Sequence, residues 1–117
     1  MRYILFVNKS KRVSKMDKNE IIERIAYARN KINLSARKLS QRIDMNDCYI
    51  NRLESKKDFL PSVEVLMRII EECGLTPEQF FYYDMNAYSK DIEIINQLKR
   101  LDDKQKEAIM TIIGSMK

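Results

Sequence analysis

The chain has 117 residues, enough for one folded domain with a short appendage. Its two glycines and two prolines are too few for the many turns of an all-β fold, whereas a hydrophobic content of 44% can supply an ordinary core. The chain contains no histidine, the commonest general base and metal ligand, and no glycine-rich loop that could hold a phosphate group. We therefore expect no catalytic residues, no cofactor and no metal site, and we do not expect an enzyme.

The formal net charge of +5 is distributed unevenly. Residues 1–15 carry five basic side chains and no acidic one, residues 24–57 carry nine basic and three acidic, and residues 58–117 carry seven basic and eleven acidic. A basic segment beside an acidic one is typical of a protein that presents one face to a polyanion, although an ordinary mixed surface would give the same balance.

Residues 1–15 show no helical periodicity and are expected to form a basic N-terminal arm or extension. Their apolar stretch, residues 3–7, is shorter than a signal peptide or a membrane span requires, and no membrane association is expected. The two cysteines lie far apart and suggest no disulfide framework, so the expected location is the cytoplasm. The folded part is expected to begin at Met16.

From residue 17 onward, apolar residues recur at intervals of three and four, which predicts an all-α fold. The expected helices span about 18–32, 36–43, 47–55, 63–73, 77–82, 90–101 and 103–116. Each follows a residue whose side chain can accept hydrogen bonds from the free amides of the first turn. These expected capping residues are Asp17, Ser35, Asn46, Ser62, Thr76, Ser89 and Asp102.

The first five helices are expected to share one core, and both cysteines, Cys48 and Cys73, are expected to be buried or half-buried. The last two helices, within residues 85–117, are expected to follow a linker and to form a helical hairpin. Its apolar stripes would cover the domain or pair with a second copy. The expected core residues are Ile21, Ile25, Ala28, Ile32, Leu34, Leu39, Ile43, Ile50, Leu53, Val63, Leu66, Ile69, Ile70, Phe80 and Phe81.

A short capped helix, a tight turn and a second short helix follow one another in residues 34–53, which is the pattern of a helix-turn-helix. Over residues 22–81 the sequence resembles the XRE family of helix-turn-helix regulators, which includes the Cro and lambda-type repressors. The resemblance implies a five-helix domain over residues 16–84. It is carried by Leu34, Ser35, Leu39, Ile43, the run Tyr49-Ile50-Asn51-Arg52-Leu53-Glu54, Pro61, Ser62, Gly74, Leu75 and Thr76.

The resemblance implies that the third helix enters the major groove of double-stranded DNA. Helical geometry independently directs Cys48, Asn51, Arg52 and Ser55 away from the core. The base-reading residues implied are Asp47, Cys48, Asn51 and Arg52, of which Arg52 can pair with guanine O6 and N7. The implied phosphate contacts are Ser35, Arg37, Asn46, Tyr49, Ser55, Lys56 and Lys57. The resemblance also implies a structural ion pair between Arg29 and Glu54.

The leading hypothesis is a sequence-specific transcriptional regulator, a repressor that binds an inverted repeat as a homodimer, of bacterial, phage or mobile-element origin. The sequence departs from the family pattern at three positions. Ala36 replaces a frequent glutamine, Asp47 is acidic where polar or basic residues are usual, and Lys56 replaces a glycine. Two alternatives stay open: a degenerate helix-turn-helix domain that binds a protein partner, which Asp47 and Ala36 favour, and an antitoxin of a toxin–antitoxin pair, whose acidic residues 58–117 could bind a basic toxin.

Overall fold

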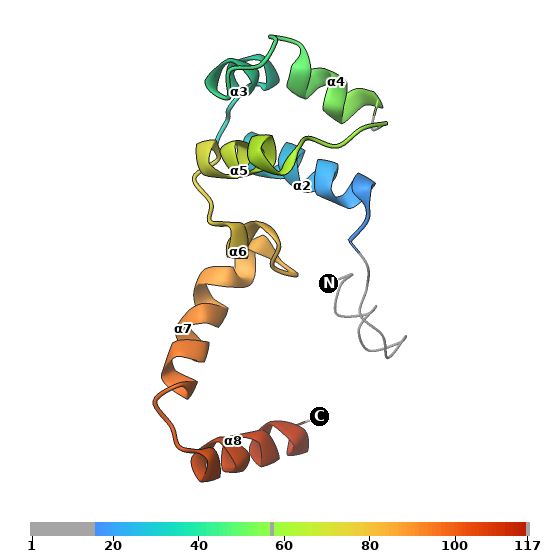
Figure 1. Cartoon of the computed structure of the whole chain (residues 1–117). Helices are drawn as coiled ribbons and strands as arrows, with labels where there is room; N and C mark the ends of the chain where they lie inside the picture. The colour runs from blue at the N-terminus through green and yellow to red at the C-terminus, as the bar shows by residue number, and fades with distance from the viewer. Residues whose placement is uncertain (1–15, 57, 117) are drawn as a thin grey trace. The chain divides into compact units, whose positions relative to one another are not determined.

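The computed structural model describes residues 16–56 and 58–116 (Figure 1). The predicted arm and Lys57 lie outside the described residues. Every regular element within the described residues is helical, so the prediction of an all-α fold is confirmed. Contacts divide the chain into two units, of which the first ends at Tyr83 and the second begins at Asp84.

The described residues of the first unit form five helices, which pack around one core. Helix α3 packs against α4, and both contact other helices of the unit, α4 with α2 and α3 with α5; α6 packs on α5. The helices are α2 (Lys18–Lys31), α3 (Ala36–Arg42), α4 (Tyr49–Lys56), α5 (Val63–Glu72) and α6 (Pro77–Phe80).

Four of the predicted caps in this unit are confirmed, those at Asp17, Ser35, Ser62 and Thr76. Each side chain accepts a hydrogen bond from the amide three residues later, at 2.9 to 3.2 Å. Such a bond satisfies one of the amides that a helix leaves free at its start. These polar residues therefore fix where the helices begin.

The predicted start of the third helix is wrong by two residues, because α4 begins at Tyr49 and not at Asp47. The side chain of Asn46 accepts a hydrogen bond from the amide of Cys48, 2.9 Å away, and its carbonyl accepts one from the amide of Tyr49. Asn46 therefore closes a turn ahead of α4, and Asp47 lies in that turn.

The core contains most of the predicted residues, but three of them are exposed: Ile32, Val63 and Phe81. All three lie at helix ends, where the helical period no longer determines the direction of the side chain. Cys48 is exposed, which contradicts the expectation of a buried or half-buried thiol and agrees with its predicted direction away from the core, whereas Cys73 is buried. The buried hydrophobic residues are Ile22, Ile25, Ala28, Leu34, Leu39, Ile43, Ile50, Leu53, Ile69, Ile70, Cys73 and Phe80.

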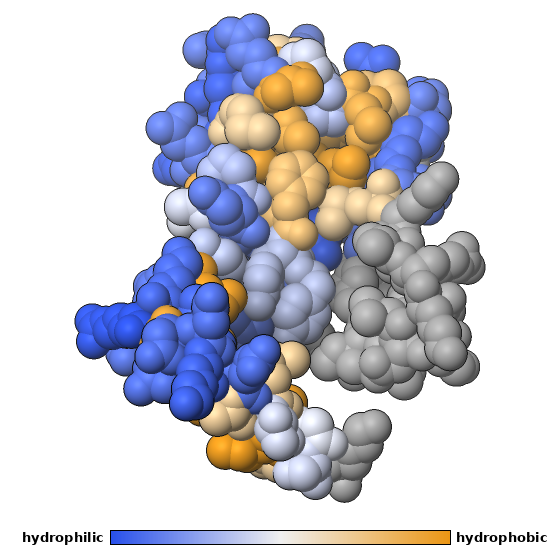
Figure 2. Space-filling model, turned by 60° about the horizontal axis from the view of Figure 1, so that its bottom comes forward, coloured by the Kyte–Doolittle hydropathy of each residue, from blue (hydrophilic) through white to orange (hydrophobic). Residues whose placement is uncertain are grey.

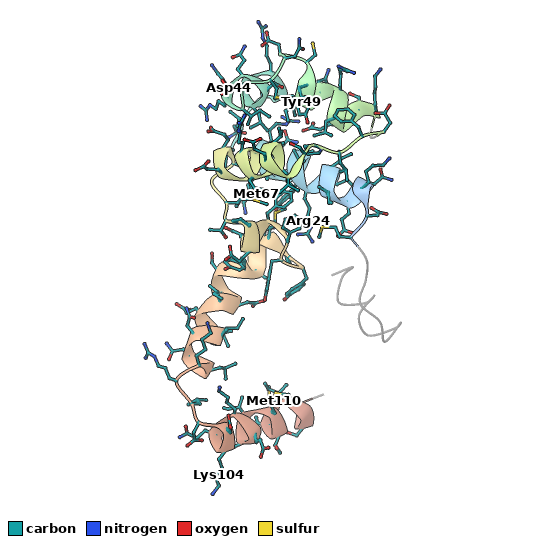
Figure 3. All side chains as sticks on the ribbon, viewed as in Figure 1. Arg24, Asp44, Tyr49, Met67, Lys104 and Met110 are labelled. Carbon is teal, nitrogen blue, oxygen red and sulfur yellow. The ribbon has the colours of Figure 1, made fainter. Side chains whose placement is uncertain are left out.

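Arg24 is a buried charge that the sequence pattern does not indicate, only 6% exposed on α2 (Figure 3). Its guanidinium donates hydrogen bonds to the carbonyl oxygens of Phe80 and Tyr82, and it lies 3.6 Å from the carboxylate of Glu20. A helix leaves its last carbonyl groups without hydrogen-bond donors. Arg24 supplies a donor to the carbonyl of Phe80, the last residue of α6, and thereby connects α6 to α2.

The second unit contains a 3₁₀ turn, η1 (Met85–Ala87), and two helices, α7 (Tyr88–Leu98) and α8 (Asp103–Ser115). The predicted cap at Ser89 is wrong, because η1 leads directly into α7 and Ser89 lies inside its first turn. The predicted cap of α8 is confirmed: the side chains of Asp102 and Gln105 each accept from the other's amide, at 2.8 and 3.1 Å.

Helices α7 and α8 keep their apolar side chains at the surface. None of the described residues 84–116 is buried, so the apolar side chains of both helices are half-buried or exposed. Figure 2 shows hydrophobic surface on both units of the chain. The most exposed apolar residues of the second unit are Ile94, Met110, Ile112, Ile113 and Met116. No described helix is long and apolar enough to cross a membrane.

Replacing Arg24 with alanine is expected to lower the free energy of unfolding by about 2–4 kcal/mol, because two carbonyl oxygens lose a charged donor within the fold. Lys18→Ala, at an exposed position in the first turn of the same helix, is the control and is expected to have little effect. Urea denaturation of both variants measures the difference. Equal unfolding free energies would contradict the role given to Arg24.

Candidate nucleic-acid interface

An ion pair joins α2 to α4 at the centre of the first unit. The guanidinium of Arg29 meets the carboxylate of Glu54 through two parallel hydrogen bonds, of 2.9 Å from Nε and 2.7 Å from Nη2. The side chains are only 13% and 16% exposed. This is the pair that the family resemblance implies.

Arg29 also acts on the segment between α2 and α3, because its Nη1 donates to the carbonyl of Leu34, 3.0 Å away. Hydrogen bonding to Glu54 raises the pKa of Arg29, which therefore stays charged. Burial raises the pKa of the neighbouring Cys73 thiol to about 11, so this thiol stays protonated and contributes as a small apolar side chain. The guanidinium of Arg29 thus holds two parts of the helix-turn-helix: the segment that leads into α3, and α4, which follows the turn.

The angle between α3 and α4 depends on Ser40, which is fully buried. Its hydroxyl donates to the carbonyl of Ala36 at 2.8 Å and accepts from the amide of Ile50 at 3.0 Å. Asp44, in the turn, has a φ of 61°, in the left-handed region that lets the chain reverse direction. The role of Ser40 was not predicted from the sequence. The feature that indicates it is a small hydroxyl residue beside Leu39 on the inner face of a short helix.

The outer face of α4 is polar and accessible. Ile50 and Leu53 are completely buried, whereas Asn51, Arg52 and Ser55, together with Cys48 just before the helix, are exposed. The hydroxyl of Ser55 donates to the carbonyl of Asn51 within the helix. The four side chains that helical geometry directs away from the core therefore share a solvent-facing surface.

Asp47 is bound to α3. Its Oδ2 lies 3.3 Å from Nε of Arg37, and its Oδ1 accepts a hydrogen bond of 3.3 Å from Nε2 of Gln41. The side chains of Arg37 and Asp47 are 73% and 50% exposed. Arg37, which the resemblance implies as a phosphate contact, is thus engaged with an acidic residue in the free protein.

The other described residues implied as phosphate contacts lie at the start of α3, on α4 or in the turn ahead of α4. Ser35 and Lys56 are exposed at the start of α3 and the end of α4. Tyr49 is half-buried, its ring packs edge-on against Phe59 at 5.8 Å, and burial raises the pKa of its hydroxyl. Lys57 lies outside the described residues. Within the described residues, no cluster of side chains could hold a metal ion.

Comparison with known protein families identifies this region. Residues 25–80 match the model of a family described as helix-turn-helix, and the match runs from α2 to the last residue of α6. The chain carries a DNA-binding helix-turn-helix domain and resembles the XRE-type regulators of transcription. No curated protein and no solved structure matches the chain.

Replacing Glu54 with alanine is expected to lower the free energy of unfolding by about 3 kcal/mol, because it leaves the largely buried charge of Arg29 without its partner. Glu93→Ala, at an exposed position in α7, is the control and should change stability by less than about 0.5 kcal/mol. Thermal and chemical unfolding provide the measurement. If the two variants melt alike, the ion pair does not have the structural role described here.

Proposed function

We propose that this protein is a sequence-specific transcriptional regulator, a repressor that binds an inverted repeat in double-stranded DNA as a dimer. The observation that carries the proposal is the two-sided character of α4. Its apolar residues are completely buried, its polar residues are exposed, and it lies inside the segment that matches the helix-turn-helix family. In this class of domain the second helix of the motif lies in the major groove.

Arg52 is proposed as the main base-reading residue. It is exposed near the middle of α4, and a guanidinium can donate two parallel hydrogen bonds to O6 and N7 of guanine. Asn51 would reach an adenine edge or a phosphate, and Cys48 would offer an apolar contact at the start of the helix. The proposed phosphate contacts are Ser35, Arg37, Asn46, Tyr49, Ser55, Lys56 and Lys57.

A dimer is proposed because α7 and α8 carry several exposed apolar side chains. The side chains of Met110, Ile112, Ile113 and Met116 are 55% to 72% exposed. A unit of about 40 residues or fewer rarely folds on its own without oligomerisation or another form of support. Pairing two copies through this surface would bury those side chains. It would also give the DNA-binding units the two-fold symmetry of an inverted repeat, with half-sites about 34–36 Å apart.

Selection from a random library of double-stranded DNA tests the base-reading role. The natural protein is expected to enrich an inverted repeat, and Arg52→Ala should lose preference at one guanine and bind that repeat about 5- to 150-fold more weakly. Arg100→Ala removes an exposed arginine from the second unit and is the matched control, with the preference unchanged. An identical repeat selected by Arg52→Ala would contradict the proposed role of Arg52.

Replacing Ile113 with glutamate is expected to convert the dimer into a monomer, because it places a charge in the apolar face of α8. Thr111→Glu adds the same charge about 200° around the helix and is expected to leave the dimer intact. Size-exclusion chromatography with light scattering measures both masses. A natural protein that is monomeric at all concentrations, or an Ile113→Glu variant that remains dimeric, would contradict this interface.

A further inference from the structure

Asp47 carries a negative charge at the edge of the surface proposed to meet DNA, where the phosphates would repel it. The structure shows how this charge is balanced. Arg37 and Gln41, one turn apart on α3, approach its two carboxylate oxygens separately, each at 3.3 Å. Residues four apart lie on the same face of a helix, so α3 holds the carboxylate from one side and limits its rotation.

The carboxylate keeps acceptor capacity on its other side. An ionised carboxylate has about four acceptor positions, and the contacts with Arg37 and Gln41 use two of them. Half of the Asp47 side chain remains exposed. The cluster therefore presents an oriented hydrogen-bond acceptor whose formal charge is cancelled by the guanidinium behind it.

Stability alone does not explain this arrangement. Ion pairs between exposed side chains contribute little to folding, because solvent and salt screen them, and the Arg37 side chain is 73% exposed. The contacts with Arg37 and Gln41 fix a hydrogen-bond acceptor at the turn that leads into α4. An acceptor in that place is suited to reading a base.

We propose that Asp47, held in place by Arg37 and Gln41, selects cytosine at one position of each half-site. This inference rests on the proposed function, because it requires that α4 enter the major groove. On the major-groove edge, cytosine presents the N4 amino group as a donor and no acceptor beside it. Adenine also presents an amino group, but next to the N7 acceptor, which repels a carboxylate, and guanine presents only acceptors. Arg37 and Gln41 act as positioning residues.

The test is selection from the same random DNA library with the natural protein and with Asp47→Asn. The natural protein is expected to enrich cytosine roughly five- to tenfold at one position of the half-site. Asp47→Asn is expected to change that position to adenine, because an amide pairs with both N6 and N7 of adenine. Asp47→Ser is a second variant, expected to lose the preference without gaining another, and circular dichroism confirms that all three proteins are folded.

The positioning role is tested by measuring binding to two duplexes that differ only at this position. Arg37→Ala and Gln41→Ala are expected to reduce the preference for cytosine about threefold, because the carboxylate is no longer held. Lys38→Ala removes an exposed positive charge from the same helix without touching Asp47. It is therefore expected to weaken binding to both duplexes equally.

Two outcomes would overturn the inference. The first is that folded natural protein and Asp47→Asn enrich the same base at every position, which would leave DNA recognition intact and exclude Asp47 as a reading residue. The second is a cytosine preference that neither Arg37→Ala nor Gln41→Ala reduces, which would remove the positioning role. The absence of any enrichment by the folded natural protein would contradict the proposed function itself.

Discussion

The paired hydrogen bonds between Arg29 and Glu54 are the interaction on which the surface proposed to bind DNA depends. They fix α4 against α2, and the third bond of Arg29, to the carbonyl of Leu34, fixes the segment that leads into α3. A planar guanidinium has the geometry to make all three bonds at once, which a lysine could not do. Arg29 on α2 therefore holds both helices of the motif: α4 directly, and α3 through the segment that leads into it.

This anchoring has consequences for recognition. Base reading requires side chains held to within a fraction of an ångström, and such positions are best supplied by rigid elements with supporting contacts. Ser40 fixes the corner between α3 and α4 from inside, while Arg37 and Gln41 hold Asp47 from outside. These contacts order the corner before α4 and the Asp47 side chain in the free protein, so the proposed DNA binding would not spend free energy on ordering them.

The sequence predicts the all-α fold, most caps and most of the core because these depend on local spacing and on single side chains. It does not predict the buried Arg24 and Ser40, which bind to Phe80, Tyr82 and Ile50 on segments distant in the sequence, nor the exposure of Ile32, Val63 and Phe81 at helix ends. The candidate site likewise contains features that local spacing determines and features that contacts between elements determine. The exposure of Asn51 and Arg52 follows from helical period, whereas the pairing of Asp47 with Arg37 depends on how the turn ahead of α4 lies against α3.

Contact between α4 and DNA is tested most directly by an NMR titration of the isotope-labelled protein with the selected duplex. If α4 is the element that contacts DNA, the largest changes in amide chemical shift occur at residues 47–56, with smaller changes at the start of α3 around Ser35 and Arg37. Changes concentrated in α5 or in the second unit, with α4 unaffected, would contradict that contact.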